Sequence, residues 1–166
     1  MAILDILVYP DSRLGRVSSP VENIDDELSK FVFDLEETMR AGPPSVGIAA
    51  PQVGRFERIV IIDVSSKPEI PNHGKLILIN PKIILKQGSV VGREGCLSVP
   101  DYTGNVMRAE VVTLQALNLV GKTLDYEMEG FEARAIQHEI DHLDGLLFLD
   151  RLVSRRNSLF RRKVYK

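Results

Sequence analysis

The sequence has little of what several common classes of protein require. Its 166 residues include one cysteine, so the chain cannot form an internal disulfide. No apolar run approaches the length of about 20 residues that a membrane-spanning helix needs. The apolar stretch at residues 1–9 is short, contains Asp5 and is not followed by a small-residue cleavage site, so it does not predict a signal peptide. We therefore expect neither a disulfide scaffold nor a membrane protein, and a cytoplasmic location.

Composition and hydrophobic spacing predict one folded domain. The chain is 44% hydrophobic and 27% charged, which fits a single globular unit with a sizeable core. Apolar residues recur at helical spacing from Leu28 to Met39, and acidic residues precede them, as suits the positive end of a helix dipole. Residues 25–40 are therefore predicted to form a helix that packs on the core.

Strand patterns occupy the middle of the chain. Residues 58–62 form a short apolar run. Residues 108–119 and 123–128 alternate in polarity around a Val-Gly-Lys turn, which predicts a hairpin. Residues 76–85 are apolar but are broken by Asn80-Pro81, which predicts two short strands that meet at a turn.

A second helix is predicted over residues 129–144, with Gly145 as its C-terminal stop. Strands followed by this helix predict an α+β fold. We expect a single domain in which short mixed or antiparallel sheets pack around the second helix, with the first helix near the N-terminus.

Histidine is also scarce, yet two of the three histidines lie in His138-Glu139-Ile140-Asp141-His142. Residues four apart project from one face of a helix, so His138 and His142 can hold a single metal ion while Glu139 lies beside it. The alternative is an amphipathic helix with two solvated histidines. The concentration of two of three histidines at this spacing favours a metal site.

A catalytic divalent metal usually has three protein ligands and one position left for water. Residues 143–166 contain neither Glu nor His, which excludes the downstream Glu ligand of many metalloproteases, and Phe148 occupies the third His position of the longer zincin pattern. Asp144, Asp150 and the upstream Cys96 remain as candidates. Of these we choose Cys96, against the alternative that it is an inert buried thiol.

Three segments together resemble the motifs of peptide deformylases. The second and third family motifs are matched by Glu94-Gly95-Cys96-Leu97-Ser98 and by Gln137-His138-Glu139-x-x-His142-x-x-Gly145. The first motif, Gly-x-Gly-x-Ala-Ala-x-Gln, is matched by residues 45–52, with Ser45 in place of the first glycine. The motifs occur in family order, and the resemblance covers essentially the whole chain.

The resemblance implies an enzyme that removes formate from the N-terminal formyl-methionine of newly made polypeptides. Its metal would be held by Cys96, His138 and His142. A divalent metal lowers the pKa of a bound water from about 15.7 toward about 7, and Glu139 can take that water's proton and pass it to the leaving nitrogen. These roles amount to amide hydrolysis.

Further roles follow from the same resemblance. The Gln52 side-chain amide and the Leu97 backbone N–H would stabilise the oxyanion; without the resemblance, Gln52 would be taken as an exposed loop residue. Glu94 could also be structural and paired with Arg108. The residues implied to bind substrate, the last two as part of a methionine pocket, are Val46, Gly47, Glu94, Gly95, Phe131 and Ala135.

The sequence indicates a metal more firmly than it indicates which metal. Imidazole and thiolate suit Zn²⁺ and also accept Fe²⁺, Ni²⁺ or Co²⁺. The resemblance implies one divalent ion per chain, with Fe²⁺ in the cell and Zn²⁺ a common occupant of purified protein.

Two rival interpretations come from other classes of protein. An endopeptidase would share the two histidines and the glutamate, but the missing downstream ligand argues against it. A ribosome-associated binding module could use the metal only for structure, with its basic end as the working part.

Charge is unevenly distributed along the chain. Residues 151–166 hold seven basic and no acidic residues, whereas residues 1–150 are formally at −9. We therefore distinguish a deformylase-like catalytic domain, residues 1–150, from a basic tail of the same domain, residues 151–166. The tail could form a helix with one basic face, could dangle or could simply be solvated. Action on nascent chains would favour contact with ribosomal RNA.

Overall fold

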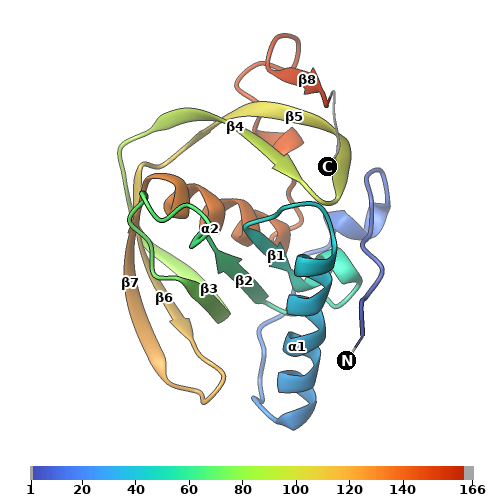
Figure 1. Cartoon of the computed structure of the whole chain (residues 1–166), viewed down its shortest axis with the longest axis vertical. Coiled ribbons are helices and arrows are strands. Elements are labelled where there is room, and N and C mark those ends of the chain that lie inside the picture. Colours follow the sequence, from blue (N-terminus) through green and yellow to red (C-terminus); the bar gives the residue numbers. More distant parts are fainter. Residues whose placement is uncertain (1, 163–166) are drawn as a thin grey trace.

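The computed structural model describes residues 2–162, which form one α+β domain of the predicted class (Figure 1). No helix in this part of the chain is both long enough and apolar enough to span a bilayer. The elements in chain order are η1 (Ser12–Gly15), α1 (Asp26–Ala41), β1 (Gly47–Ala49), η2 (Ala50–Val53), β2 (Ile59–Asp63), β3 (Lys75–Gln87), β4 (Val90–Cys96), β5 (Val99–Arg108), β6 (Val111–Leu117), β7 (Thr123–Glu129), α2 (Gly130–Leu143), η3 (Phe148–Arg151) and β8 (Leu159–Arg161).

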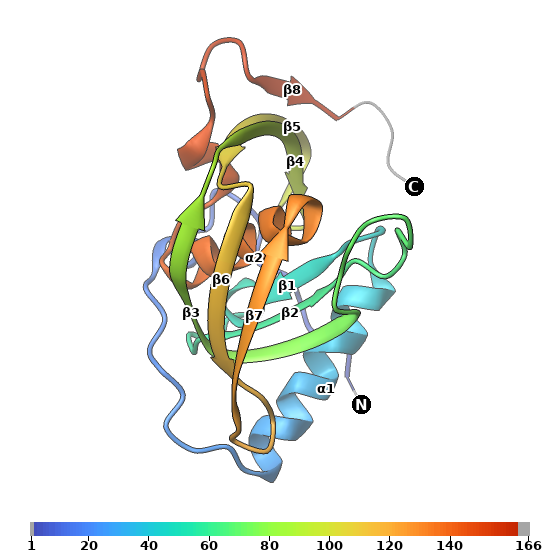
Figure 2. The same cartoon turned by 90° about the vertical axis from the view of Figure 1, so that its left-hand side faces the viewer.

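Helix α2 lies at the centre, between two antiparallel sheets (Figures 1 and 2). The five-stranded sheet has the order β1-β2-β3-β6-β7, and the three-stranded sheet has the order β4-β5-β8. Every α2 residue from Glu132 to Leu143 is buried, including its histidines and its charged side chains. Because a buried polar group is costly unless it is hydrogen-bonded, each of these side chains calls for a partner or a function.

Helix α1 is the predicted N-terminal helix, and it covers the other face of β1 and β2. Its N-cap is Asp25, whose side chain accepts the Leu28 N–H at 2.9 Å. Its buried stripe packs on apolar strand residues, and this cluster contains Leu28, Val32, Leu35, Met39, Ile48, Ile59 and Ile61.

The predicted hairpin is confirmed as β6 and β7, which are paired from Val111↔Glu129 to Leu117↔Thr123. Together with β3 it forms the sheet face on which α2 packs. The shared core includes Leu78, Val112, Leu114, Met128, Ile136, Ile140 and Leu143. The predicted core side of α2 is therefore confirmed.

The prediction of two short strands over residues 76–85 is wrong, because β3 runs unbroken through Asn80-Pro81. Asn80 adopts a positive φ of 51°. Its side chain accepts the Val21 N–H at 2.8 Å and donates to the Val21 carbonyl at 3.0 Å. The strand shifts register between Ile79 and Lys82. These long-range bonds hold a bulge where the local sequence favours a turn.

Residues 151–162 of the C-terminal segment do not form an α-helix and are packed on the domain. They begin at the end of η3 and contain β8, which pairs with β5 at Thr103↔Phe160. Arg155 and Arg156 are exposed. The last four residues of the predicted tail, 163–166, lie outside the described residues.

Candidate metal centre and active site

A cleft of about 810 Å³ opens between β1, β4 and α2. All six residues implied to bind substrate line this cleft: Val46, Gly47, Glu94, Gly95, Phe131 and Ala135. Gln52, Cys96, Leu97, His138 and Glu139 line it too. Folding thus brings three segments far apart in the sequence to one cavity.

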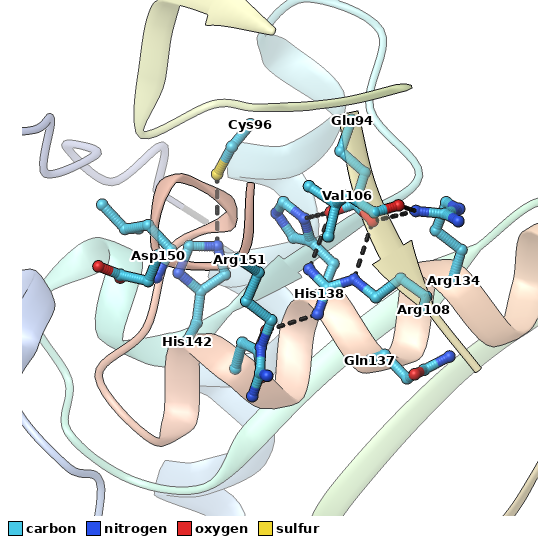
Figure 3. A network of polar contacts seen from close by, with 12 residues as sticks. Glu94, Cys96, Val106, Arg108, Arg134, Gln137, His138, His142, Asp150 and Arg151 are labelled. Carbon is cyan, nitrogen blue, oxygen red and sulfur yellow. Dashed lines mark hydrogen bonds and ion pairs between the residues drawn. The ribbon is translucent and has the colours of Figure 1, made fainter. Parts of the chain in front are cut away.

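The three predicted metal ligands meet beside the cleft. The end of β4 supplies Cys96, and successive turns of α2 supply His138 and His142. Their ligand atoms lie within 4.8 Å of one another, and Cys96 Sγ is 3.3 Å from His142 Nε2 (Figure 3). Of the other two candidates, Asp144 pairs with Arg58 and Asp150 accepts the Leu147 N–H.

The donor set fits a divalent transition metal. His138 Nδ1 is 2.8 Å from Glu94 Oε1, so Nε2 is the ring atom that can serve as the metal ligand. The Ser98 N–H donates to Cys96 Sγ at 3.4 Å, which orients the sulfur. One thiolate and two imidazoles are ligands that suit Zn²⁺ or Fe²⁺.

Glu94 connects the metal cluster to a buried charge network. Arg108 Nε and Nη2 donate to the two oxygens of Glu94 at 2.8 and 2.9 Å, and Arg134 Nη1 donates to Glu94 Oε2 at 2.6 Å. Burial opposes ionisation of Glu94, but the bonds with Arg108 and His138 outweigh burial and hold its pKa far below the ordinary value. Glu94 is therefore a fixed anion.

Glu139 stands apart from this network. Across residues 2–162 its buried Oε1 has no hydrogen-bond partner. Burial raises the pKa of Glu139 to about 7. An ionisable carboxyl that faces a cleft, with a pKa near neutral, is suited to accept and return a proton.

Burial and neighbouring charges shift the pKa values of the two histidines in opposite directions. Burial lowers the pKa of His138, but the hydrogen bonds to Cys96 and Glu94 outweigh burial and raise it well above the ordinary value. Burial, and then the charge of His138, lowers the pKa of His142. His142 is therefore a neutral imidazole with a free electron pair.

Gln52 is buried rather than exposed, at 1% relative exposure. Its Oε1 accepts the Ala49 N–H at 2.9 Å, and its amide nitrogen donates to Ser98 Oγ at 3.0 Å and lies 3.6 Å from Cys96 Sγ. The amide donor therefore points toward the metal ligands. Leu97 follows Cys96 directly, at the tight turn between β4 and β5.

Four residues of the site were not found from the sequence: Ser98, Arg134, Asp141 and Arg151. Asp141 lies inside the histidine motif. A buried aspartate needs a charged partner, but the sequence did not show that this face of α2 is covered. Arg134 contacts Glu94, which lies 40 residues earlier in the chain, and Arg151 contacts Asp141 after the chain turns back from α2. Their roles depend on tertiary packing.

A cysteine and two histidines, beside a buried carboxylate at the end of a partly apolar cleft, are typical of a metal-dependent hydrolase. The family model for polypeptide deformylase matches residues 3–158. A peptide deformylase of Alkalilimnicola ehrlichii is 44% identical over 166 residues, which are 100% of this chain and 91% of that protein.

Solved structures agree with this match. A crystal structure of a peptide deformylase from Legionella pneumophila has a TM-score of 0.85 at 40% identity, over 93% of this chain and 89% of that one. The peptide deformylase from Ehrlichia chaffeensis in complex with actinonin has a TM-score of 0.87 at 38% identity, over 94% and 92%. The chain belongs to the polypeptide deformylase family. It is a metal-dependent enzyme that removes the formyl group from N-formylmethionine at the start of nascent polypeptides.

Proposed function

We propose that Cys96, His138 and His142 hold one divalent metal ion, and that the chemistry takes place beside it in the cleft. The observation that carries this proposal is the convergence of these three side chains next to Glu139. When bound, the ion supplies Lewis acidity and makes water a nucleophile at neutral pH.

Glu139 is the general base in this proposal. It takes a proton from the water that attacks the formyl carbon and returns it to the leaving amine nitrogen. Its carboxylate lines the cleft, and among residues 2–162 its Oε1 has no hydrogen-bond partner, unlike Glu94, whose oxygens are occupied by Arg108, Arg134 and His138. Two buried carboxylates thus have separate roles.

Gln52 and Leu97 stabilise the oxyanion that forms when the formyl carbonyl is attacked. The bond from the Ala49 N–H to Gln52 Oε1 fixes which end of the amide faces the metal ligands. The Leu97 backbone N–H lies in the adjacent turn. Loss of one such donor typically raises the barrier by about 3–4 kcal/mol.

The substrate peptide binds as an added strand beside β1. In the five-stranded sheet β1 is an edge strand, and Gly47 lies on it facing the cleft. Val46 and Gly95 form neighbouring walls, while Phe131 and Ala135 supply apolar surface for the methionine side chain. Glu94 also borders this groove, but its main role is to orient the His138 ring through the contact with Nδ1.

We assign Fe²⁺ as the ion in the cell, with Zn²⁺, Ni²⁺ or Co²⁺ able to occupy purified protein. The mixed thiolate and imidazole donor set accepts all four. Metal analysis of protein prepared without oxygen tests this assignment. Iron at about one ion per chain, with activity lost in air and regained on anaerobic addition of Fe²⁺, is the expected result; zinc alone in fully active anaerobic protein would contradict it.

We also propose that the enzyme works in the cytoplasm and that its basic segment, residues 151–166, contacts the ribosome. Exposed Arg155 and Arg156 supply positive charge near the C-terminal end of the catalytic domain, residues 1–150. Deletion of residues 155–166 should reduce co-sedimentation with ribosomes at low salt. Unchanged co-sedimentation would refute the contact.

A peptide pair tests the proposed reaction. An N-formyl-Met peptide should release formate, while the same peptide without the formyl group stays intact. Cleavage of an internal peptide bond in either peptide would favour the endopeptidase interpretation instead.

A further inference from the structure

The segment that follows α2 packs against the proposed metal site. Phe148 of η3 is buried, and its ring stacks on the His138 ring with centroids 6.3 Å apart and planes 22° apart. Three residues later, Arg151 reaches back to α2 (Figure 3). The segment is therefore packed against the site that α2 carries.

Arg151 is bound to Asp141 through two atoms. Its Nε donates to Asp141 Oδ2 at 2.7 Å and its Nη2 donates to Asp141 Oδ1 at 3.1 Å. A two-point contact between guanidinium and carboxylate fixes orientation as well as distance. Asp141 is only 9% exposed at its side chain, so its rotation is set by these partners.

Asp141 in turn holds Arg108, whose Nη1 donates to Asp141 Oδ2 at 2.5 Å. Arg108 then uses its other two nitrogens on Glu94, as described above, and Glu94 Oε1 meets His138 Nδ1. Charges alternate in sign along this path, and the Arg108 and Glu94 side chains are 3% and 4% exposed. Each side chain is thus oriented by the next.

We propose that Arg151 is a positioning residue for the metal ligand His138, acting through Asp141, Arg108 and Glu94. The inference rests on the proposed metal site. In it, the C-terminal segment does more than offer charge to a partner, because its first residue sets the ring orientation of a ligand. Partners of metal-binding histidines typically change metal affinity or activity about 10- to 100-fold, and a residue further along the path should change it less.

The test measures metal retention rather than turnover, with Co²⁺ as the probe. The unaltered protein is loaded with one Co²⁺ per chain, and transfer of the ion to an excess of chelator is followed by its visible spectrum. Arg151→Ala should release Co²⁺ about 3- to 10-fold faster and should alter the spectrum, which responds to ligand geometry. Arg151→Lys keeps the charge but loses the two-point contact, so its rate of Co²⁺ release should lie between those of the unaltered protein and Arg151→Ala.

Two control variants separate positioning from charge and from folding. Arg155→Ala removes the same charge from an exposed position nearby and should release Co²⁺ at the unaltered rate. Leu152→Ala removes side-chain packing of the same segment, where Leu152 packs against the cluster that contains Val106, and should lower the Tm of the metal-free protein without changing the release rate.

The inference is overturned if Arg151→Ala releases Co²⁺ at the unaltered rate. It is equally overturned if Leu152→Ala and Arg151→Ala speed release in proportion to their losses in Tm, since the effect would then be one of folding. Failure of the unaltered protein to bind Co²⁺ would overturn the metal site itself, and this inference with it.

Discussion

A β-carbon at Gly47 would lie 2.7 Å from Glu139 Oε2 and 3.0 Å from Glu139 Cγ and Cδ. The edge strand that borders the proposed substrate groove thus approaches the proposed base as closely as its backbone allows. Gly47 therefore sets the position of Glu139 as well as the shape of the groove, which explains in physical terms why a glycine is needed there.

Replacement of Gly47 by alanine should displace the Glu139 carboxylate. A displacement of about 1 Å can cost about 100-fold in rate, so we expect kcat/KM for an N-formyl-Met peptide to fall at least about tenfold. Circular dichroism should show an intact fold. Gly15→Ala is the control, because nothing lies within 4 Å of its added carbon. If Gly47→Ala were as active as this control, the close approach of Gly47 would not determine the position of the Glu139 carboxylate.

Removal of the Glu94 charge should loosen the metal. We expect Glu94→Gln to weaken metal affinity about 10- to 100-fold, because His138 loses the anion that orients it and Arg108 loses one of its two carboxylate partners. Competition with a chelator measures the affinity. Glu36→Gln, which breaks an ion pair with Arg40 and Lys75 away from the site, is the matched control. Equal affinities in the two variants would show that Glu94 does not support the ligand.

Ser45, which replaces the first glycine of the family motif, should compete with the substrate. Its hydroxyl donates to the Gly47 carbonyl at 2.8 Å, on the strand edge that is proposed to bind the peptide. We expect Ser45→Gly and Ser45→Ala to lower KM about 2- to 10-fold at unchanged kcat, since a hydrogen bond contributes about 0.5–1.5 kcal/mol. A KM that is unchanged or raised in both variants would show that this carbonyl does not pair with substrate.

Glu139 should destabilise the metal-free protein at neutral pH. Because its pKa rises from 4.5 to about 7 on folding, the folded state holds the proton more tightly, and stability falls as pH rises across that interval. The free energy of unfolding of Glu139→Gln, relative to that of the unaltered protein, should therefore increase by on the order of 2–3 kcal/mol between pH 4.5 and pH 8. Urea unfolding of metal-free protein at both pH values measures this, with exposed Glu22→Gln as control. If the difference in unfolding free energy between the two proteins did not change with pH, burial would not raise the pKa of Glu139.

Local patterns were enough to predict much of this fold. The stripe from Leu28 to Met39 and the alternation on both sides of Gly121 reflect which face of an element meets the core, and the structure confirms both elements. Asn80-Pro81 misled the prediction because hydrogen bonds to Val21, 59 residues away, hold a bulge within one continuous strand where local preference favours a turn.

The candidate site divides in the same way. His138 and His142 could be paired from the sequence because helix geometry alone places them on one face, whereas the choice of Cys96 needed elimination and a family resemblance. Arg151 and Asp141 could not be paired, because their contact depends on how the chain turns back after α2. The sequence identifies the groups that carry out the chemistry more readily than those that hold them in place.

In the proposed mechanism, Glu139 transfers the proton during formamide hydrolysis while Cys96, His138 and His142 hold the metal. The most direct measurement is single-turnover formate release by Glu139→Gln and by the unaltered enzyme, each with its metal content determined on the same sample. We expect one ion per chain in both proteins and a rate of formate release that is about 100-fold or more lower in the variant. Full metal content together with an unaltered rate of formate release in Glu139→Gln would contradict it.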